Sequence, residues 1–345
     1  MGRAETFELP DTIEAIEYYY EQGLTDGLPV VPPTPERVSR FLQSGGVGPE
    51  EVLGARSSRN WVVTAEKVAI NAVMAGCLPE YAPVVIAAVQ ALLTPGYNAS
   101  GVAETSGNSA PMLLVNGPVR ARLKINCGTN LFGPGWRANA TIGRALRLVL
   151  INVCGVVPGT TDKSVFGHSG RYTMCIGENE EASPWEPFHV EQGLPLEASA
   201  VTLFSVRTPI EVFEQGARSP EDLLDTLSHT IAANVVCHGQ VIVILSPQHA
   251  QEIGPSGWSK VRVKEYISRR VNDQRPIVCP DQGQSGSMFG VVFPTMKDYS
   301  STFPTTPEGI ILMVAGGGSG GMSTILPIWA SGFVSKHITR QIMDL

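Results

Sequence analysis

The chain has 345 residues, of which 43% are hydrophobic and 17% are charged, and its formal net charge is −7. It contains no basic block and no interleaving of basic and aromatic residues, which argues against nucleic acid or an anionic membrane as the main partner. No apolar run approaches the roughly 18 residues that span a bilayer. Because the acidic first residues do not resemble a signal peptide, we expect a cytoplasmic protein.

The cysteines and histidines are scattered along the chain. The six cysteines form no CxxC pair, which is typical of free thiols in a reducing cytosol and of neither a disulfide framework nor a zinc ribbon. The six histidines show no HExxH or HxH spacing. The sequence therefore predicts no metal site and leaves any cofactor unknown.

Helices and strands alternate in the first half of the chain. The periodicity predicts helices over 10–22, 34–42, 65–76, 79–93 and 140–153. Asp11, Thr64 and Asn139 precede three of these helices as candidate N-cap residues. Buried strands are predicted at 112–115 and 171–176, with a further extended run at 123–125.

The second half repeats this order. Strands are predicted at 200–206, 240–245 and 309–315, and helices at 219–235, 247–253 and 259–271. Residues 280–308 read as a Gly/Pro/Ser-rich excursion without periodicity. The alternation predicts an α/β fold of two similar lobes, with mostly parallel sheets covered by helices. We place the N-terminal lobe at 1–195 and the C-terminal lobe at 196–345. A high apolar content in a chain of this length also favours a homo-oligomer.

The loop 126–139 is the strongest candidate for a functional site. It holds Cys127 among several glycines, which let the backbone approach a ligand closely. Asn139 is the predicted N-cap of the following helix, whose positive dipole end attracts anions. Arg137 and Arg144 add positive charge there, so we expect an anion pocket that lowers the pKa of Cys127. The alternative is a strand–turn–helix joint that contains a buried structural cysteine.

An acidic segment at 178–191 is a second polar focus. Glu178 and Glu180 are its leading candidates for moving protons as a general acid and base. The histidines at 168 and 189 offer an alternative, in which glutamates and histidines of 168–189 bind a metal ion. A further alternative is that the charges only form a solvated surface.

The glycine-rich segment Gly316–Gly321 directly follows a predicted buried strand. It lacks the Walker lysine and is not followed by a clear helix, which argues against a nucleotide site. We expect its backbone N–H groups, at Gly317, Gly318 and Ser319, to bind a substrate carboxylate. The alternative is a strand end that needs space for another backbone.

Four stretches, at 25–34, 66–77, 135–145 and 178–187, together resemble one family of bacterial proteins. This family carries the UGSC (selenocysteine or cysteine) label and is distantly related to the B component of the glycine, sarcosine and betaine reductases. The resemblance implies a thiol-bearing α/β enzyme. The chain lacks a Cys-Gly-Ser-Cys motif, so the redox pair of the family does not carry over. The reductase components process a precursor at a cysteine, which raises cleavage before Cys127 as an alternative to an intact chain.

We therefore interpret the chain as a cysteine-dependent enzyme for a small anionic metabolite, with its site in a cleft between the two lobes. The step would be a reductive cleavage, or a lyase or hydrolase reaction through a covalent thio-intermediate. The candidate catalytic residues are Cys127, Glu178 and Glu180, and the candidate substrate-binding residues are Asn126, Gly128, Arg137, Asn139, Arg144, Gly317, Gly318 and Ser319. A metal-assisted lyase or hydrolase, and a non-catalytic subunit of a larger complex, remain as alternatives.

Overall fold

The structure is a computed structural model that describes residues 5–234, 240–278, 287–288, 291–292, 306–329 and 335–343. Most of the predicted excursion at 280–308 lies outside these residues, as do Cys237 and Cys279. No helix in the described part of the chain is long and apolar enough to cross a membrane.

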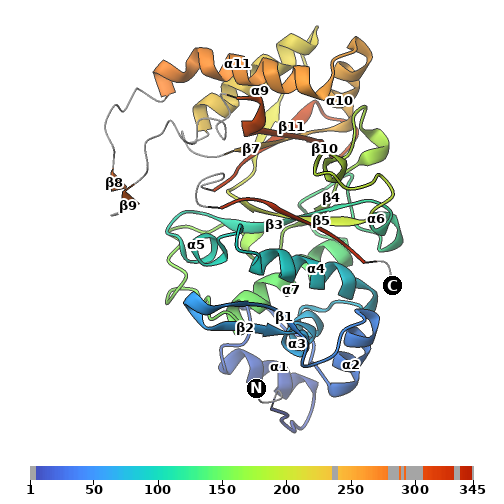
Figure 1. Ribbon diagram of the computed structural model, residues 1–345, viewed down its shortest axis with the longest axis vertical. Coiled ribbons are helices and arrows are strands. Elements are labelled where there is room, and N and C mark those ends of the chain that lie inside the picture. Colours follow the sequence, from blue (N-terminus) through green and yellow to red (C-terminus); the bar gives the residue numbers. More distant parts are fainter. Residues whose placement is uncertain are drawn as a thin grey trace.

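Two four-stranded sheets form the centre of the molecule and lie one above the other (Figure 1). The first sheet has the order β12-β5-β3-β4, with β3 at Ala110–Asn116, β4 at Cys175–Gly177, β5 at Ala200–Val206 and β12 at Ile338–Gln341. The second has the order β10-β7-β11-β6, with β6 at Ile210–Phe213, β7 at Val241–Leu245, β10 at Ile310–Val314 and β11 at Met322–Pro327.

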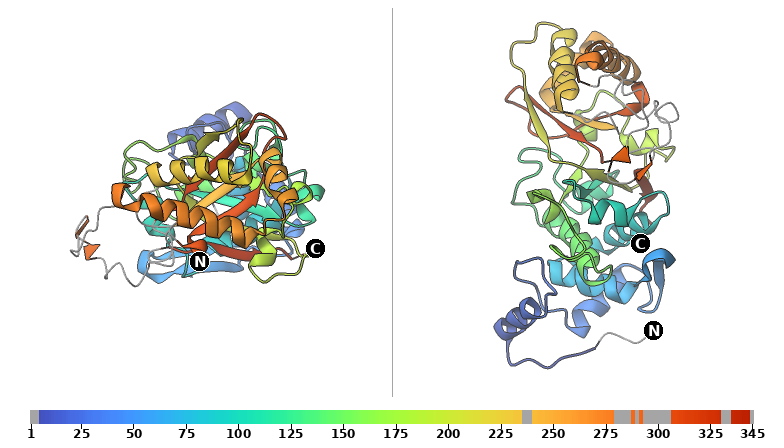
Figure 2. Two further views of the ribbon diagram at one scale, coloured as in Figure 1. Left: turned by 90° about the horizontal axis from the view of Figure 1, so that it is seen from above. Right: turned by 90° about the vertical axis from the view of Figure 1, so that its left-hand side faces the viewer.

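Helices cover the outer face of each sheet, which gives four layers (Figures 1 and 2). The first sheet is covered by α4 (Ala82–Leu93) and α7 (Arg137–Asn152), and the second by α9 (Pro220–Asn234), α10 (Pro247–Ile253) and α11 (Lys260–Val278). Beyond α7 the chain adds α1 (Thr12–Glu21), α2 (Pro35–Ser44), the hairpin β1–β2 (Val52–Arg56 and Trp61–Thr64) and α3 (Ala65–Ala75). The short elements are α5 (Ala99–Glu104), α6 (Val119–Arg122), α8 (Phe188–Glu191), β8 (Ser287–Met288) and β9 (Val291–Val292).

The sequence alternation within the strands explains this layering, because successive side chains of a strand point to opposite faces. In β3, Leu113 and Val115 face the helices, whereas Met112 and Leu114 face the second sheet. In the second sheet, Val243 packs under the helices, while its neighbours in β7 contact the first sheet. Strands β3 and β7 are therefore apolar on both faces, and each fully buried apolar side chain contributes roughly 1.5–3 kcal/mol.

The two sheets exchange a strand. After β5, the chain crosses into the second sheet, where β6 pairs antiparallel with β11. After β11, the chain crosses back, and β12 pairs antiparallel with β5. The two crossing segments meet in an antiparallel bridge between Val206 and Ile328, where the amide of Arg207 donates to the carbonyl of Pro327 at 2.8 Å. Each sheet thus has one edge strand that directly follows a strand of the other sheet, since β6 follows β5 and β12 follows β11.

The α/β class is confirmed, and the two sheets share one sequence of strand directions. The expectation of mostly parallel sheets is wrong, because each sheet contains one parallel pair and two antiparallel pairs. The division at residue 195 also fails as a boundary between sheets, since β5 and β12 complete the first one. Within the predicted strand 171–176, only the last residues join β4, and 123–125 lies in the loop after α6.

The strand exchange predicts that the last residues of the chain stabilise the N-terminal core. Ile342 follows β12, is 1% exposed and belongs to the core between the first sheet and its helices. We expect Ile342→Ala to lower the free energy of unfolding by about 2–4 kcal/mol in urea denaturation. The neighbouring Met343 is 75% exposed, so Met343→Ala serves as control and is expected to change it by less than about 0.5 kcal/mol. Equal effects of the two substitutions would contradict the exchange.

Candidate functional site

The carboxyl ends of β3, β4 and β10 meet where the two sheets adjoin. The amide of Asn179, just beyond β4, donates to the carbonyl of Val314 at the end of β10, at 2.8 Å. The amide of Gly316 donates to the carbonyl of Cys127 at 2.9 Å. The Cys127 loop of the first half and the glycine-rich segment of the second half therefore lie against each other. Ligands of α/β proteins commonly bind outside the carboxyl ends of the strands.

Two asparagines fix the backbone on either side of Cys127. The side chain of Asn139 accepts a hydrogen bond from the amide of Asn126 at 2.7 Å and donates to its carbonyl at 3.0 Å. The side chain of Asn126 accepts from the amide of Gly128 at 2.9 Å and donates to the carbonyl of Thr129 at 3.1 Å. These bonds hold the loop in one conformation, and they occupy the polar atoms that were predicted to bind substrate.

The predicted role of Asn139 as a helix cap is wrong. Helix α7 begins at Arg137, and its N-cap is Trp136, whose side chain makes no capping bond. Asn139 therefore lies inside the first turn, where its amide nitrogen also donates to the carbonyl of Cys175 at 2.9 Å. It ties α7, the Cys127 loop and β4 together.

The two arginines of the predicted anion pocket are bound elsewhere. Arg137 donates twice to the carbonyl of Gly76, at 3.1 and 3.0 Å, and so satisfies the C-terminal end of α3. Arg144 makes two charge-assisted bonds to Asp26, at 2.8 and 2.7 Å, and the Asp26 side chain is only 3% exposed. Both arginines thus hold the N-terminal segments to α7. Arg137, Asn139 and Arg144 therefore do not form the predicted anion pocket, because their side chains bind other parts of the protein.

Arg120, in α6, supplies the positive charge beside Cys127. Its Nη1 lies 3.7 Å from the Cys127 Sγ, and its side chain is 7% exposed. The same guanidinium binds Glu181 through two bonds, at 3.2 and 2.8 Å, and Glu180 at 3.0 Å. Glu180 also accepts from the amide of Gly117 at 2.8 Å. These contacts connect the segment after β3, which carries Arg120 and Cys127, with the segment after β4, which carries Glu180 and Glu181.

The prediction of a lowered pKa for Cys127 is wrong, because the pKa of this thiol is raised. Burial of the thiol is the largest effect and raises its pKa, whereas the nearby Arg120 lowers it. Glu181 raises the pKa again, since its carboxylate repels a thiolate. Burial and the charge of Glu181 together outweigh the effect of Arg120, so the net shift of the Cys127 pKa is upward.

Glu178 is fully buried directly after β4. Its Oε2 accepts from the side chain of Asn116 at 2.6 Å and from the amide of Phe188 at 2.8 Å. Burial raises the pKa of Glu178 to about 7, although Lys260 and these two donors act against that shift. Its Oε1 and the Oδ1 of Asn116 have no hydrogen-bond partner among the described residues. A carboxyl group that exchanges its proton near neutral pH therefore lies beside Glu180.

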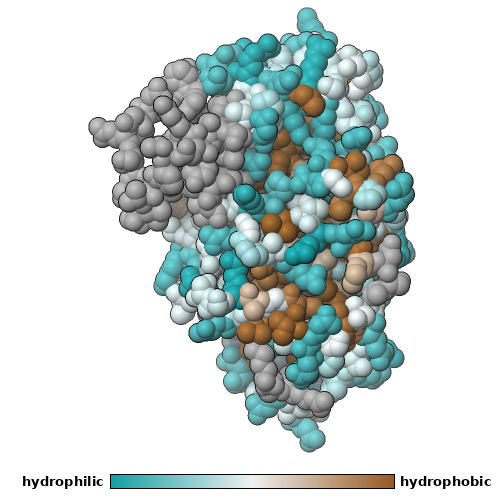
Figure 3. Space-filling view, viewed as in Figure 1, coloured by the Kyte–Doolittle hydropathy of each residue, from teal (hydrophilic) through white to brown (hydrophobic). Residues whose placement is uncertain are grey.

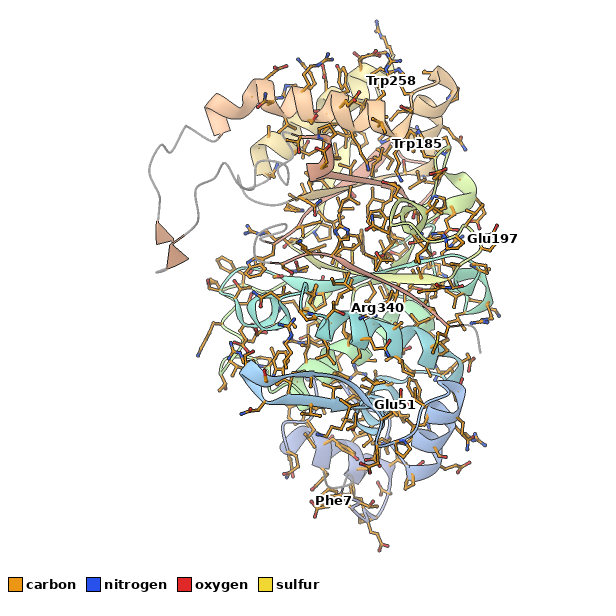
Figure 4. The ribbon with its side chains drawn as sticks, viewed as in Figure 1. Phe7, Glu51, Trp185, Glu197, Trp258 and Arg340 are labelled. Carbon is orange, nitrogen blue, oxygen red and sulfur yellow. The ribbon has the colours of Figure 1, made fainter. Side chains whose placement is uncertain are left out.

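The loop that carries Glu180 and Glu181 is fixed to the helices of the second sheet. Trp185 donates from its indole nitrogen to the carbonyl of Trp258 at 2.9 Å, and the two labelled rings lie near each other in Figure 4. Lys260 donates to the carbonyl of Glu186 at 3.0 Å. The position of the acidic loop thus depends on α11, which begins at Lys260.

The glycine-rich segment faces the Cys127 loop. Gly316 has φ of +99°, which favours glycine, and it turns the chain out of β10. A side chain at Gly317 would lie 3.3 Å from the Oγ1 of Thr129, so the close approach of the two loops favours glycine there as well. The amides of Gly317, Gly318 and Ser319 make no hydrogen bond within the described part of the chain.

The histidines of the metal-binding alternative have separate partners. Burial of the ring lowers the pKa of His168, and the charge of the neighbouring Arg171 lowers it further. His189 is fully buried and contacts the carbonyl of Leu196 at 3.2 Å. Among the described residues, no group of three or more His, Cys, Asp or Glu side chains is arranged to hold a metal ion.

A surface groove of about 540 Å³ lies along α2, in the N-terminal part of the chain. Its lining comprises Pro35, Val38, Ser39, Leu42, Gln43, Gly46, Val47, Pro49 and Glu66. None of these residues belongs to the Cys127 loop or to the acidic loop, so the groove is separate from the site.

Sequence reasoning missed Arg120 and Asn116. The available signal is the turn Asn116-Gly117-Pro118 at the end of a buried strand, which is followed within two residues by a charged side chain. A polar residue and a cation at the carboxyl end of an apolar strand are unusual, because both are buried there at a cost unless they have partners.

Glu178 predicts a pH dependence of stability. Its pKa is near 4.5 when unfolded and about 7 when folded, so the folded state binds more protons between these values. Stability is therefore fully present below about pH 4.5 and is lost as the pH rises through 7, by roughly 3 kcal/mol at about 1.4 kcal/mol per unit. We expect Glu178→Gln to remove this decline in urea unfolding between about pH 5 and pH 8. The exposed Glu197→Gln is the control and keeps the wild-type slope.

Arg144 predicts a second stability effect. Lysine keeps the charge but not the two-bond geometry with the buried Asp26, so we expect Arg144→Lys to lower the free energy of unfolding by about 2 kcal/mol. The exposed pair of Arg40 and Glu36 gives a matched control, for which Arg40→Lys costs less than about 0.5 kcal/mol. An unchanged unfolding midpoint for Arg144→Lys would return this arginine to the pool of ligand-binding candidates.

Comparisons of the chain with models of protein families, with curated proteins and with solved structures found no match.

Proposed function

We propose that the protein is a cysteine-dependent enzyme that acts on a small anionic metabolite at the carboxyl ends of β3, β4 and β10. The observation that carries the proposal is the 3.7 Å contact between the Cys127 Sγ and the Nη1 of the buried Arg120. A guanidinium beside a thiol stabilises the thiolate that forms when the thiol loses its proton. Both groups lie near the carboxyl ends of the strands, where α/β enzymes commonly bind their ligands.

The burial of the cysteines supports Cys127 as the reactive thiol. Cys127 is half-buried, whereas Cys77, Cys154 and Cys175 are buried. Burial raises the pKa of Cys77 and of Cys154 to about 12 and raises that of Cys175 as well. These three thiols therefore stay protonated near neutral pH and are typical of inert core residues.

The acidic loop supplies groups for proton transfer. Glu180 and the Cys127 thiol contact the same guanidinium, and the pKa of Glu178, about 7, lets it hold or release a proton near neutral pH. In the proposed hydrolase step, the thiol proton passes to a carboxylate of this loop while Sγ adds to a carbonyl carbon of the substrate, and the π electrons of that C=O bond move onto its oxygen. The adduct then expels its leaving group, which takes the proton from the carboxylate. Water hydrolyses the resulting thioester and restores the Cys127 thiol.

A lyase or hydrolase step fits these contacts better than a reductive cleavage. Reduction by one thiol requires a second thiol or another electron donor, whereas the contacts described above consist of one thiol, a guanidinium and carboxylates. Covalent addition by Cys127 requires only a nucleophile, a proton acceptor and a site for the anionic group. The backbone amides of Gly317, Gly318 and Ser319 would bind a second polar end of the substrate.

The proposal includes a cytoplasmic homo-oligomer. Hydrophobic residues gather in the middle and lower part of the face shown in Figure 3, between hydrophilic areas. Apolar surface of this kind often lies at an interface between subunits. Measurement of the mass in solution by light scattering tests this part of the proposal.

The function is tested first through the thiol. We expect iodoacetamide at neutral pH to label Cys127 faster than the buried Cys77, Cys154 and Cys175, as read by mass spectrometry of the native protein. The labelling rate should rise with pH as the thiolate forms, and it should become similar for all cysteines in denaturant. Labelling of Cys127 no faster than that of the buried thiols would refute the proposal.

A screen of small carboxylic acids tests catalysis itself. Turnover detected with the wild type is expected to fall by at least about a thousandfold in Cys127→Ser, because the hydroxyl is a far weaker nucleophile at neutral pH. Full activity of this variant would favour the metal-assisted alternative. Absence of turnover together with an unreactive thiol would favour a non-catalytic subunit.

A further inference from the structure

The two carboxylates on Arg120 differ in how they are held. Glu180 is 13% exposed at its side chain and has further donors in Asn116 and the amide of Gly117, at 3.0 and 2.8 Å. Glu181 is 72% exposed, and Arg120 provides both hydrogen bonds that its carboxylate makes to other side chains in the described residues. Glu180 is therefore part of the buried framework, whereas Glu181 reaches the guanidinium from solvent.

Arg120 remains paired without Glu181. Its charge is matched by Glu180 at 3.0 Å, so a second carboxylate is not needed to keep the buried guanidinium from being uncompensated. The bond between an exposed carboxylate and arginine contributes little to folding, because water replaces it at low cost. The two nitrogens that face Glu181 present the fork that recognises any carboxylate.

We propose that Arg120 binds the carboxylate of the substrate, and that Glu181 occupies this position in the unliganded protein. The inference rests on the proposed function, since it assigns the binding site of the acidic group. The Nη1 that contacts Glu181 at 3.2 Å also lies 3.7 Å from the Cys127 Sγ. A carboxylate in the place of Glu181 thus brings its neighbouring carbons to the thiol. The substrate class is a small carboxylic acid with its electrophilic carbon one or two bonds from the carboxylate.

Two alkylating reagents that differ in one charged group test this assignment. Iodoacetate and iodoacetamide both react with the thiolate at a carbon one bond from the carboxylate or amide, and both release iodide. Their rate ratio at Cys127 therefore cancels any change in the thiolate fraction, which matters because Glu181 itself raises the pKa of this thiol. The ratio isolates the contribution of the carboxylate.

We expect Glu181→Gln to raise the ratio of the iodoacetate rate to the iodoacetamide rate at Cys127 by roughly tenfold, because the vacated fork then binds the reagent. Glu181→Ala should raise it at least as much. Glu186→Gln is the matched control, since it removes the same charge from the same exposed loop but its carboxylate does not contact Arg120. The control should keep the wild-type ratio within about twofold.

Competition provides a second readout on the same proteins. Added acetate, at constant ionic strength, is expected to slow iodoacetate labelling of Glu181→Gln and to have a smaller effect on the wild type and on Glu186→Gln. A ratio that is equal in Glu181→Gln and Glu186→Gln, or no protection by acetate, overturns the assignment of Arg120. The proposed function survives that result if Cys127 is still the most reactive thiol. If neither reagent labels Cys127 in any variant, the assignment of Arg120 and the proposed function are both overturned.

Discussion

The packing of the two sheets against each other is the constraint on which the rest of the molecule depends. Its apolar contacts come from strands of both halves, and the antiparallel bridge between Val206 and Ile328 fixes where the exchanged strands cross. Neither sheet is complete without a strand contributed across this crossing. The two halves therefore share both sheets, and the packing of the sheets against each other fixes the relative position of their strand ends.

This packing places three strand ends beside one another and so creates the candidate site. The ends of β3 and β4 bring Asn116, Gly117 and Glu178 together, and the end of β10 brings the glycine-rich segment against Cys127. The polar groups are buried at this point because the sheets exclude water on both sides. The buried guanidinium of Arg120 is paired with Glu180, and this ion pair holds a cation next to the thiol.

The arginines of α7 show how tertiary contacts redirect charge. Arg137 and Arg144 are close to Cys127 in the sequence. Both side chains nevertheless extend to the N-terminal segments, where Arg137 donates to the carbonyl of Gly76 and Arg144 to the carboxylate of Asp26. Arg120, which belongs to a short helix after β3, points to the thiol instead. A guanidinium reaches whichever acceptor the packing of distant segments provides. Proximity along the chain therefore does not identify the cation that acts on Cys127.

The sequence by itself determined the local structure, because periodicity and caps act over a few residues. It gave the α/β class, the strand at 200–206, and the N-caps Asp11 and Thr64, and it pointed to the Cys127 loop and the glycine-rich segment. The tertiary structure alone decided the antiparallel pairings, the exchange of β6 and β12, and the choice of Arg120 as partner of the thiol. These features depend on contacts between residues far apart in the chain, and an apolar strand can pair with a parallel or an antiparallel neighbour.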